Sequence, residues 1–336
     1  MHHSDDRPPG LPPDPRLLPG VPVLRRDADH LQVGLAEPCV VLPDRPEVRA
    51  LLDRLSGLTG PTGTAGTDPV RSPDVSPATL LALARLARAG LLVDREVMAR
   101  CLATYADGPA QRAAALASLH ASPRSADRQW ADRVRLRVRL EGAPADRQAL
   151  ERVLAAGGVG TVLGDADLVV LLVDGEPDRE HLDTLQQADV AHLLVRSVLA
   201  EVEVGPLVVP GRTACVRCLD AHRTDVDPRW PLLLAQGGAG VRDGHAAPPV
   251  RDPALWQLAL GWAARDVLRH ADGEQPSTWS ATVRVGPDLE PVRRSWLRHP
   301  RCGCGWADLH GPPAHQYSES SLPSIERRCS REQVSQ

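Results

Sequence analysis

Four of the seven cysteines in the chain form two closely spaced pairs. Two residues separate Cys215 from Cys218, and one residue separates Cys302 from Cys304. Thiolates at such spacings are common ligands of Zn²⁺, and four of them complete a tetrahedral site. Because four protein ligands leave no coordination position for water, the pattern predicts a zinc ion that stabilises the fold and takes no part in catalysis.

The cysteine pattern leaves alternatives open. Each pair is also compatible with buried or redox-active thiols, and the second pair has one intervening residue where two are commoner. His299 is close enough in sequence to replace one of the thiolates. Cys39, Cys101 and Cys329 remain without an assigned role.

Cysteine use and the N-terminus bear on location. An odd number of cysteines with tight local spacings fits a reducing compartment better than a disulfide framework. The first residues, MHHSDD, are polar and acidic, unlike a signal peptide. No apolar segment reaches the ~20 residues that span a bilayer. We therefore expect a cytoplasmic protein that does not associate with a membrane.

Nucleotide-binding α/β folds bind phosphate at the turn between the first strand and the first helix, where the sequence reads G-x-G-x-x-G. The chain has EGAPAD there, so Gly142 is the only glycine, and Pro144 removes an N–H donor. Glu141 and Asp146 add negative charge where a phosphate would lie. We therefore predict no cofactor-binding residue, with Gly142 a contact only if ATP is bound after all.

The other candidate side chains give no catalytic site. Asp165, Asp167 and Asp174 flank an apolar strand, and we expect them to be solvated turn residues and not Mg²⁺ ligands. The remaining candidates are dispersed histidines without a Ser or Cys nucleophile as an evident partner: His181, His192, His222, His245 and His270. We expect most of these histidines on the surface, and we assign no catalytic residue.

Composition excludes further classes of activity. The chain of 336 residues contains no lysine, which rules out any activity that needs a lysine side chain of its own. Its formal net charge of -4 gives no general attraction to nucleic-acid phosphates. The length leaves room for two domains.

The N-terminal elements suggest a small mixed unit. Residues 1–17 are rich in proline and charge and are expected to be a disordered tail. Three short β-type runs follow, VPVLRR, LQVGLA and CVVLP, and then two amphipathic helices over residues 46–57 and 77–90. Ser76 is expected to cap the second helix. These elements predict a winged-helix-like module over residues 18–95, with a plain α+β capping domain as the alternative.

The C-terminal part reads as an α/β domain. After a helical linker over residues 96–130, RVRLRVRLEG alternates as a half-buried strand does. The order then becomes helix, strand VGTVL, strand DLVVLLVDG, helix and strand VAHLLVRSV, which is typical of a parallel βαβ sheet. We therefore predict a Rossmann-like domain over residues 131–311, followed by a disordered tail over residues 312–336.

Three segments carry a resemblance to a known family. VGPLVVPGRTACVRCLDAHR, ALWQLALGWAARDVL and HPRCGCGW resemble the ThiF/MoeB-like, ubiquitin-activating superfamily, over roughly residues 134–306. Within it, the chain looks most like the cyclodehydratase partner proteins of azoline-forming (TOMM) peptide biosynthesis. The resemblance implies that the N-terminal module binds the leader of a precursor peptide, and that a YcaO-type partner performs the ATP-dependent chemistry. The stretch between VGTVL and DLVVLL is too short for the ribose-binding segment of the adenylating members.

The resemblance also suggests where a leader peptide would bind. An extended peptide would add as a strand beside the module's sheet, near the second helix. The expected contact residues are Cys39, Val40, Val41, Leu42, Leu80, Arg85 and Arg88. The alternative is that Leu80, with Leu83 and Leu86, only fills the core of the module.

Three functions are compatible with these features. The first is a non-catalytic subunit that binds a leader peptide and presents the precursor to a YcaO-type cyclodehydratase, with a possible homodimer. The second is an ATP-dependent adenylyltransferase of the ThiF class. The third is a winged-helix transcription regulator, in which Arg85 and Arg88 would meet DNA phosphates. We rank the third lowest because Asp94 and Glu96 dilute the local positive charge.

Overall fold

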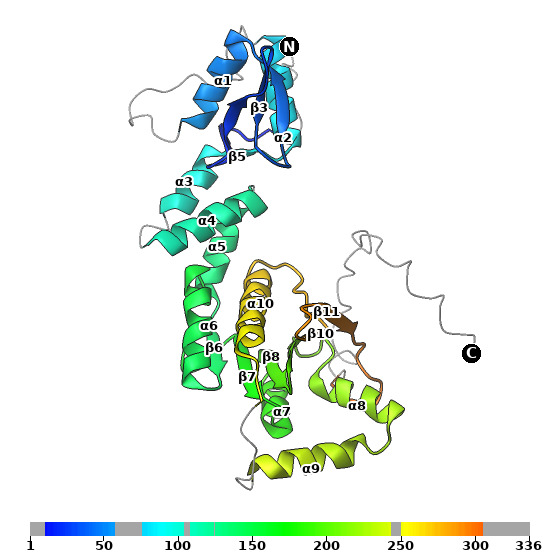
Figure 1. Cartoon of the computed structure of the whole chain (residues 1–336). Helices are drawn as coiled ribbons and strands as arrows, with labels where there is room; N and C mark the ends of the chain where they lie inside the picture. The colour runs from blue at the N-terminus through cyan, green and yellow to red at the C-terminus, as the bar shows by residue number, and fades with distance from the viewer. Residues whose placement is uncertain (1–10, 58–75, 104–107, 124, 243–249, 305–336) are drawn as a thin grey trace, which may run out of the picture.

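The computed structural model describes residues 11–57, 76–103, 108–123, 125–242 and 250–304. Figure 1 shows a small N-terminal unit, a group of three helices below it, and an α/β domain built around a larger sheet. The mixed α/β class expected from the sequence is confirmed.

The N-terminal unit packs two helices against short strands. Strands β2 (Val23–Arg25), β3 (His30–Val33) and β4 (Val40–Pro43) form the expected antiparallel sheet. Helices α1 (Pro46–Ser56) and α2 (Pro77–Arg88) bury leucines against it, and the Ser76 hydroxyl accepts a hydrogen bond from the Thr79 N–H at 3.2 Å, as a helix cap does.

The expected N-terminal tail ends earlier than residue 17. Pro15–Leu17 forms β1, which pairs antiparallel with β5 (Leu92–Asp94), and Leu17 is buried in the core of the unit. The proline-rich composition hid this strand, which is fixed by the buried Leu17 side chain and by pairing of all three residues with β5. The expected C-terminal tail, residues 312–336, lies outside the described residues.

Three helices connect the two units: α3 (Arg95–Ala103), α4 (Pro109–Ala121) and α5 (Ala126–Arg135). The strand expected from RVRLRVRLEG is therefore too long at its start, because Arg133 and Arg135 belong to α5 and the strand begins at Val138. The alternation of arginine with apolar residues was misleading because the Arg133 side chain is buried on the same face of α5 as Trp130.

A buried ion pair ties α5 to the α/β domain. The Arg133 guanidinium donates two hydrogen bonds to the Asp272 carboxylate, both at 2.6 Å, and a third to the Ser118 hydroxyl at 3.1 Å. Asp272 lies at the C-terminal end of α10 (Pro253–Ala271). Only 5% of the Arg133 side chain and 2% of the Asp272 side chain are exposed. The pair therefore fixes the three-helix group on the larger domain.

We predict that Arg133→Met lowers the free energy of unfolding by about 3–5 kcal/mol, because it leaves the Asp272 carboxylate buried without its partner. Chemical denaturation followed by circular dichroism measures the change. Arg135→Met is the matched control: Arg135 is mostly exposed and pairs with Asp132 at 3.2 Å, so its loss should change stability by about 1 kcal/mol or less. Equal effects of the two variants would contradict the structural role of Arg133.

The larger sheet has six strands in the order β11-β10-β9-β8-β7-β6. Strands β6 (Val138–Glu141), β7 (Leu168–Asp174) and β8 (Ala191–Val198) are parallel, as the βαβ pattern predicts. The remaining strands, β9 (Glu201–Val208), β10 (Ala281–Val285) and β11 (Pro291–Ser295), continue the sheet by antiparallel pairing.

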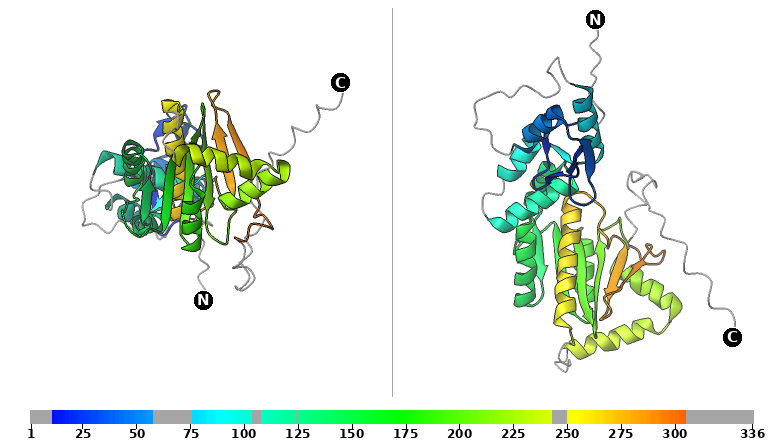
Figure 2. Two further views of the ribbon diagram at one scale, coloured as in Figure 1. Left: turned by 90° about the horizontal axis from the view of Figure 1, so that it is seen from below. Right: turned by 45° about the horizontal axis from the view of Figure 1, so that its top comes forward.

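Helices cover both faces of this sheet. Helix α6 (Pro144–Ala156) and α10 pack on one face around the fully buried Trp256. Helix α7 (Arg179–Gln187) and the start of α8 (Val216–Val226) cover the other face through Leu182, Leu185 and Val216. Helix α9 (Trp230–Arg242) follows α8 and lies at the periphery of the domain (Figures 1 and 2).

The expected strand VGTVL is reduced to a single bridge. Thr161 pairs in parallel with Val138, and the Val162 N–H donates to the Val138 carbonyl at 2.8 Å, but no strand of the described residues extends the sheet there. Strand β6 is therefore an edge strand of the sheet. The connection from α6 to β7 is short, and within the described residues it contacts the outer side of β6 through the Thr161 bridge.

Candidate metal centre

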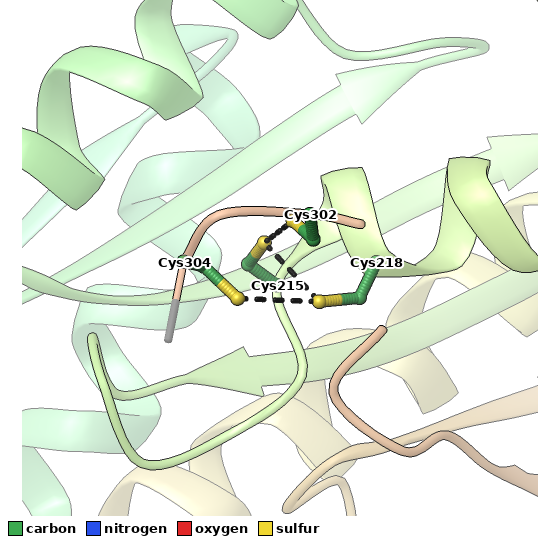
Figure 3. A group of neighbouring side chains, drawn as sticks. All are labelled: Cys215, Cys218, Cys302 and Cys304. Carbon is green, nitrogen blue, oxygen red and sulfur yellow. Dashed lines mark hydrogen bonds between the residues drawn. The ribbon is translucent and has the colours of Figure 1, made fainter. Parts of the chain in front are cut away.

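The four cysteines predicted as metal ligands come together at one end of α8. Their Sγ atoms point toward one another in Figure 3 and all lie within 4.8 Å of each other. The Sγ atom of Cys215 lies 3.7 Å from the Sγ atom of Cys218 and 3.5 Å from that of Cys302. The Sγ atoms of Cys218 and Cys304 are 3.3 Å apart. A zinc ion with Zn–S bonds of about 2.3 Å needs sulfur atoms about 3.8 Å apart, so the donor set fits a tetrahedral zinc ion.

The first pair is positioned by the start of a helix. Cys215 is the residue before α8 and Cys218 lies in its first turn, where the Cys218 N–H donates to the Cys215 carbonyl at 2.9 Å. Both thiols are buried, Cys218 completely. The loop that leads into the helix is fixed by the Thr213 hydroxyl, which accepts the Val209 N–H at 2.7 Å. The helical turn therefore aims both thiols at one point.

The second pair lies on the turn after β11. The Cys302 N–H donates to the carbonyl of His299 at 3.0 Å, and Gly303 between the two cysteines has φ of 71°, a conformation that favours glycine. His299, the alternative ligand suggested by the sequence, bonds elsewhere: its Nε2 lies 2.8 Å from the Asp225 carboxylate. The described geometry therefore favours four sulfur ligands.

Without a metal, the thiols share protons through sulfur hydrogen bonds. Cys215 donates to Cys218, which lowers the pKa of Cys218 and raises that of Cys215. The hydrogen bond with Cys215 also lowers the pKa of Cys302, to about 7. Thiolate is the form that binds a metal.

Asp225 holds the second pair against α8. Its carboxylate accepts from His299 Nε2 and from the Arg301 guanidinium, and the Arg301 N–H donates to His299 Nδ1 at 3.1 Å. These hydrogen bonds hold the pKa of Asp225 below its usual range, with the bond from His299 the largest cause. His222 adds an edge contact to the His299 ring at 4.7 Å. No feature of the sequence pointed to Asp225.

We predict that Asp225→Asn increases the metal dissociation rate about 10–100-fold, because outer-shell partners of ligand-bearing loops affect metal affinity by that factor. Transfer of the metal to a chromogenic chelator measures the rate. Asp227→Asn, at the exposed C-terminal end of the same helix, is the control and should leave the rate unchanged. Equal rates for wild type and Asp225→Asn would show that the loop is held without this carboxylate.

Close packing and charged side-chain pairs occupy the turn after β6. A Cβ at Gly142 would lie 2.5 Å from the Leu172 carbonyl oxygen, so close packing of β6 on β7 explains the glycine. Glu141 bonds to His181 at 2.6 Å, and Asp146, in the first turn of α6, pairs with Arg251 at 2.8 Å. Side-chain pairs thus occupy the helix N-terminus where a nucleotide phosphate would bind in related folds.

The residues expected to bind peptide fall into two groups. Val40 and Leu42 are buried in the core of the N-terminal unit and lie opposite Val33 and Leu31 of β3, so their side chains are not open to a peptide. Cys39, Arg85 and Arg88 are exposed, and Val41 and Leu80 are half-buried. The Arg85 guanidinium donates to the Val41 carbonyl at 3.2 Å. Strand β4 and helix α2 therefore do lie side by side.

His192 was expected among surface histidines, but the structure places it in the interior. It is 1% exposed at the start of β8, where Nδ1 bonds to the Val190 carbonyl at 3.0 Å and desolvation lowers its pKa. Its position in the strand AHLLVRSV, which is buried on both faces, was the available signal.

The comparisons with known proteins identify the fold. No protein-family model matches the chain, and no curated protein sequence matches it. Among solved structures, the heterocyclase TruD is similar at a TM-score of 0.63 and 18% identity, over 89% of this chain and 44% of that one. A heterocyclase in complex with substrate and cofactor gives 0.60 and 19%, over 87% and 40%. The chain shares the fold of the part of each heterocyclase that it covers.

The same fold extends to E. coli MccB. Its complex with MccA has a TM-score of 0.57 and 12% identity to this chain, over 87% of this chain and 99% of MccB. The chain thus spans less than half the length of the two heterocyclases but nearly all of MccB. These likenesses agree with the resemblance to cyclodehydratase partner proteins inferred from the sequence.

No helix among the described residues is long and apolar enough to cross a membrane.

Proposed function

We propose that this chain is a leader-peptide-binding subunit without adenylating activity of its own. It presents a ribosomally made precursor peptide to a separate YcaO-type cyclodehydratase, which forms the azolines. The edge of β4 beside α2 carries this proposal, since β4 ends the three-stranded sheet and the Val41 main chain points away from β3, where an added strand would pair. The winged-helix-like module of residues 18–95 is the recognition element.

The fold likeness supports a second polypeptide in the reaction. The chain matches heterocyclases over 40–44% of their length, and we infer that a partner supplies the rest of the activity. In this scheme the metal centre is a structural zinc site: Cys215, Cys218, Cys302 and Cys304 hold the ion, which links α8 to the end of the sheet. The surroundings are cytoplasmic, where thiolates stay reduced.

An adenylating enzyme is the second candidate, because a structure of MccB with ATP also shares the fold, with a TM-score of 0.56 over 99% of MccB. The acidic side chains around Gly142 count against it. Glu141, Asp146 and Asp174 lie on or beside the turns that follow β6 and β7, and Arg251 is the cation that pairs with Asp146 and Asp174. Repulsion between these carboxylates and a triphosphate disfavours binding.

Calorimetric titration separates the two candidates. Metal-loaded protein is titrated with Mg²⁺-ATP and, separately, with the leader region of a precursor peptide encoded beside it. We expect heat from the peptide and none from Mg²⁺-ATP. Saturable binding of Mg²⁺-ATP, with release of pyrophosphate when peptide is added, would replace the proposal with the adenylating function. A third titration, with duplex DNA at low salt, should show no binding. That result would argue against the function of a transcription regulator.

A further inference from the structure

The four clustered cysteines differ in their access to small molecules. A cavity of about 290 Å³ lies beside the cluster, and three of the four residues line it: Cys215, Cys302 and Cys304. Cys218 is completely buried and is not part of the lining. Cys302 and Cys304 are half-buried and are the most exposed of the four. A molecule that enters the cavity therefore meets the second pair first.

The rest of the wall is polar, with paired charges. Arg217 pairs with Asp183, Nε to Oδ1 at 2.9 Å. Arg179 donates two hydrogen bonds of 3.1 Å to Asp220. Because each of these guanidinium groups has a carboxylate partner, neither is a bare cation that would select an anion. A water molecule occupies only about 30 Å³ in the liquid, so the cavity has room for a small neutral molecule such as hydrogen peroxide.

Each of the two more exposed thiols has a sulfur atom of the other segment close by. The Sγ atom of Cys304 lies 3.3 Å from that of Cys218, and the Sγ atom of Cys302 lies 3.5 Å from that of Cys215. An S–S bond is about 2.0 Å long, so small side-chain rotations bring either pair to bonding distance. The start of α8 and the turn after β11 are thus placed for two disulfides between them (Figure 3).

We propose that Cys302 and Cys304 are sites of oxidative modification by a hydroperoxide. The products are two disulfides, one between Cys218 and Cys304 and one between Cys215 and Cys302, and the metal is released because its thiolate ligands are consumed. The inference rests on the cysteine cluster and its cavity and not on leader binding, which the N-terminal unit carries.

The chemistry of each disulfide is balanced by one molecule of hydrogen peroxide. The sulfur of the attacked thiolate bonds to one peroxide oxygen, the O–O bond breaks, and hydroxide leaves, which gives a sulfenic acid. The neighbouring thiolate then attacks the sulfenic sulfur, forms the S–S bond and displaces a second hydroxide. Two protons convert the two hydroxides to water. The two sulfur atoms supply the two electrons that reduce the peroxide.

The choice of partners decides what oxidation does to the fold. Disulfides between the two segments keep the turn after β11 attached to α8 after the metal has left, since Cys218 and Cys304 are 86 residues apart in the chain. Disulfides within each pair would leave the two segments unlinked. Thiol reductants reverse either product. Oxidation is therefore a reversible change of the metal centre that retains the contact between the segments.

Peptide mapping of the oxidised protein is the first test. Full-length, metal-loaded protein is treated with hydrogen peroxide, a chromogenic chelator follows metal release, and free thiols are alkylated before digestion with trypsin. Arg217 separates Cys215 from Cys218, whereas only a glycine lies between Cys302 and Cys304. Trypsin therefore gives one peptide with Cys215, one with Cys218, and one with both Cys302 and Cys304.

We expect the peptide that begins at Cys302 to be joined to both of the others. Peptides of Cys215 and Cys218 joined only to each other would overturn the proposal, as would metal release without any disulfide. The map reads the same way in protein that carries no metal and in protein that binds no leader peptide, so failure of either of those functions is distinguished from failure of this inference.

A cavity-filling substitution tests the route of the oxidant. Gln187 lines the cavity at the exposed C-terminal end of α7. Gln187→Trp changes no cysteine and should slow peroxide-driven metal release and thiol loss about threefold or more, because oxidation follows access to the sulfur. Gln148→Trp, on the exposed face of α6, is the control and should react at the wild-type rate. Metal content and thermal unfolding before oxidation confirm that both variants are folded. Equal rates for Gln187→Trp and wild type would overturn the cavity as the route.

Limited proteolysis tests the retained contact. Oxidised, metal-free protein should survive at least about tenfold longer than reduced protein from which a chelator has removed the metal, because the disulfides restrict opening of the segment after β11. Addition of dithiothreitol should return the oxidised protein to the faster rate. Equal lifetimes of the oxidised and the reduced metal-free protein would contradict the attachment.

Discussion

Cys218→Ser is expected to abolish zinc binding and to lower the unfolding temperature of the α/β domain by at least about 10 °C. Cys218 is the most deeply buried of the four thiols, and its Sγ lies within 4 Å of the Sγ atoms of both Cys215 and Cys304. Structural zinc ions bind with apparent free energies of about 10–16 kcal/mol in small domains, so loss of one ligand removes a large part of the stabilisation. Metal analysis and thermal denaturation measure both effects.

The control for this experiment is Cys39→Ser. Cys39 is exposed and far from the cluster in sequence, so its variant should keep one zinc ion per chain and the unfolding temperature of the wild type. Thiol alkylation of the purified protein tests the redox alternative, since a disulfide would remove two reactive thiols from the count. Retention of zinc by Cys218→Ser would contradict the four-thiolate site.

Val41→Pro is expected to weaken leader-peptide binding at least about tenfold. The substitution removes one main-chain hydrogen bond to the peptide, and the proline ring occupies the space that the peptide carbonyl would need. The Val41 carbonyl points away from β3, toward Arg85. The N–H and carbonyl of one strand residue face the same side, so the Val41 N–H also belongs to the free edge. Proline removes that donor and is tolerated on edge strands.

Val41→Thr is the matched variant, because threonine keeps the N–H and favours strands. Its affinity for the peptide, measured by calorimetry, should stay within about twofold of wild type. Equal binding by the proline and threonine variants, with both folded, would exclude strand addition at this edge. Binding would then have to use side chains elsewhere on the N-terminal unit.

The sequence predicted the elements whose apolar spacing is regular. The helix after Ser76 and the parallel strands β7 and β8 follow directly from capping and from buried runs such as LVVLLV. It failed where tertiary contacts override local pattern. Arg133 looks like the solvated position of a strand, but its pairing with Asp272, 139 residues away, makes it an interior residue of a helical group.

The clustering of the four cysteines was predictable from the sequence. Cysteine spacing alone identified the four residues that the structure brings together. Their supporting contacts were not predictable, because Asp225 reaches His299 across 74 residues of sequence and neither residue type marks that contact.

The position of the thiol pairs gives the metal a role in the order of assembly. Strands β6 to β9 join neighbours that follow one another along the chain, but β10 returns to β9 only after the excursion through α8, α9 and α10. One thiol pair opens this excursion and the other follows β11, so an ion held by both pairs would close a loop between Cys215 and Cys302, 87 residues apart. Closure of long loops is entropically unfavourable and gains most from a clip. We therefore expect that zinc starvation leaves chains whose parallel strands have paired while β10 and β11 stay detached and open to proteases.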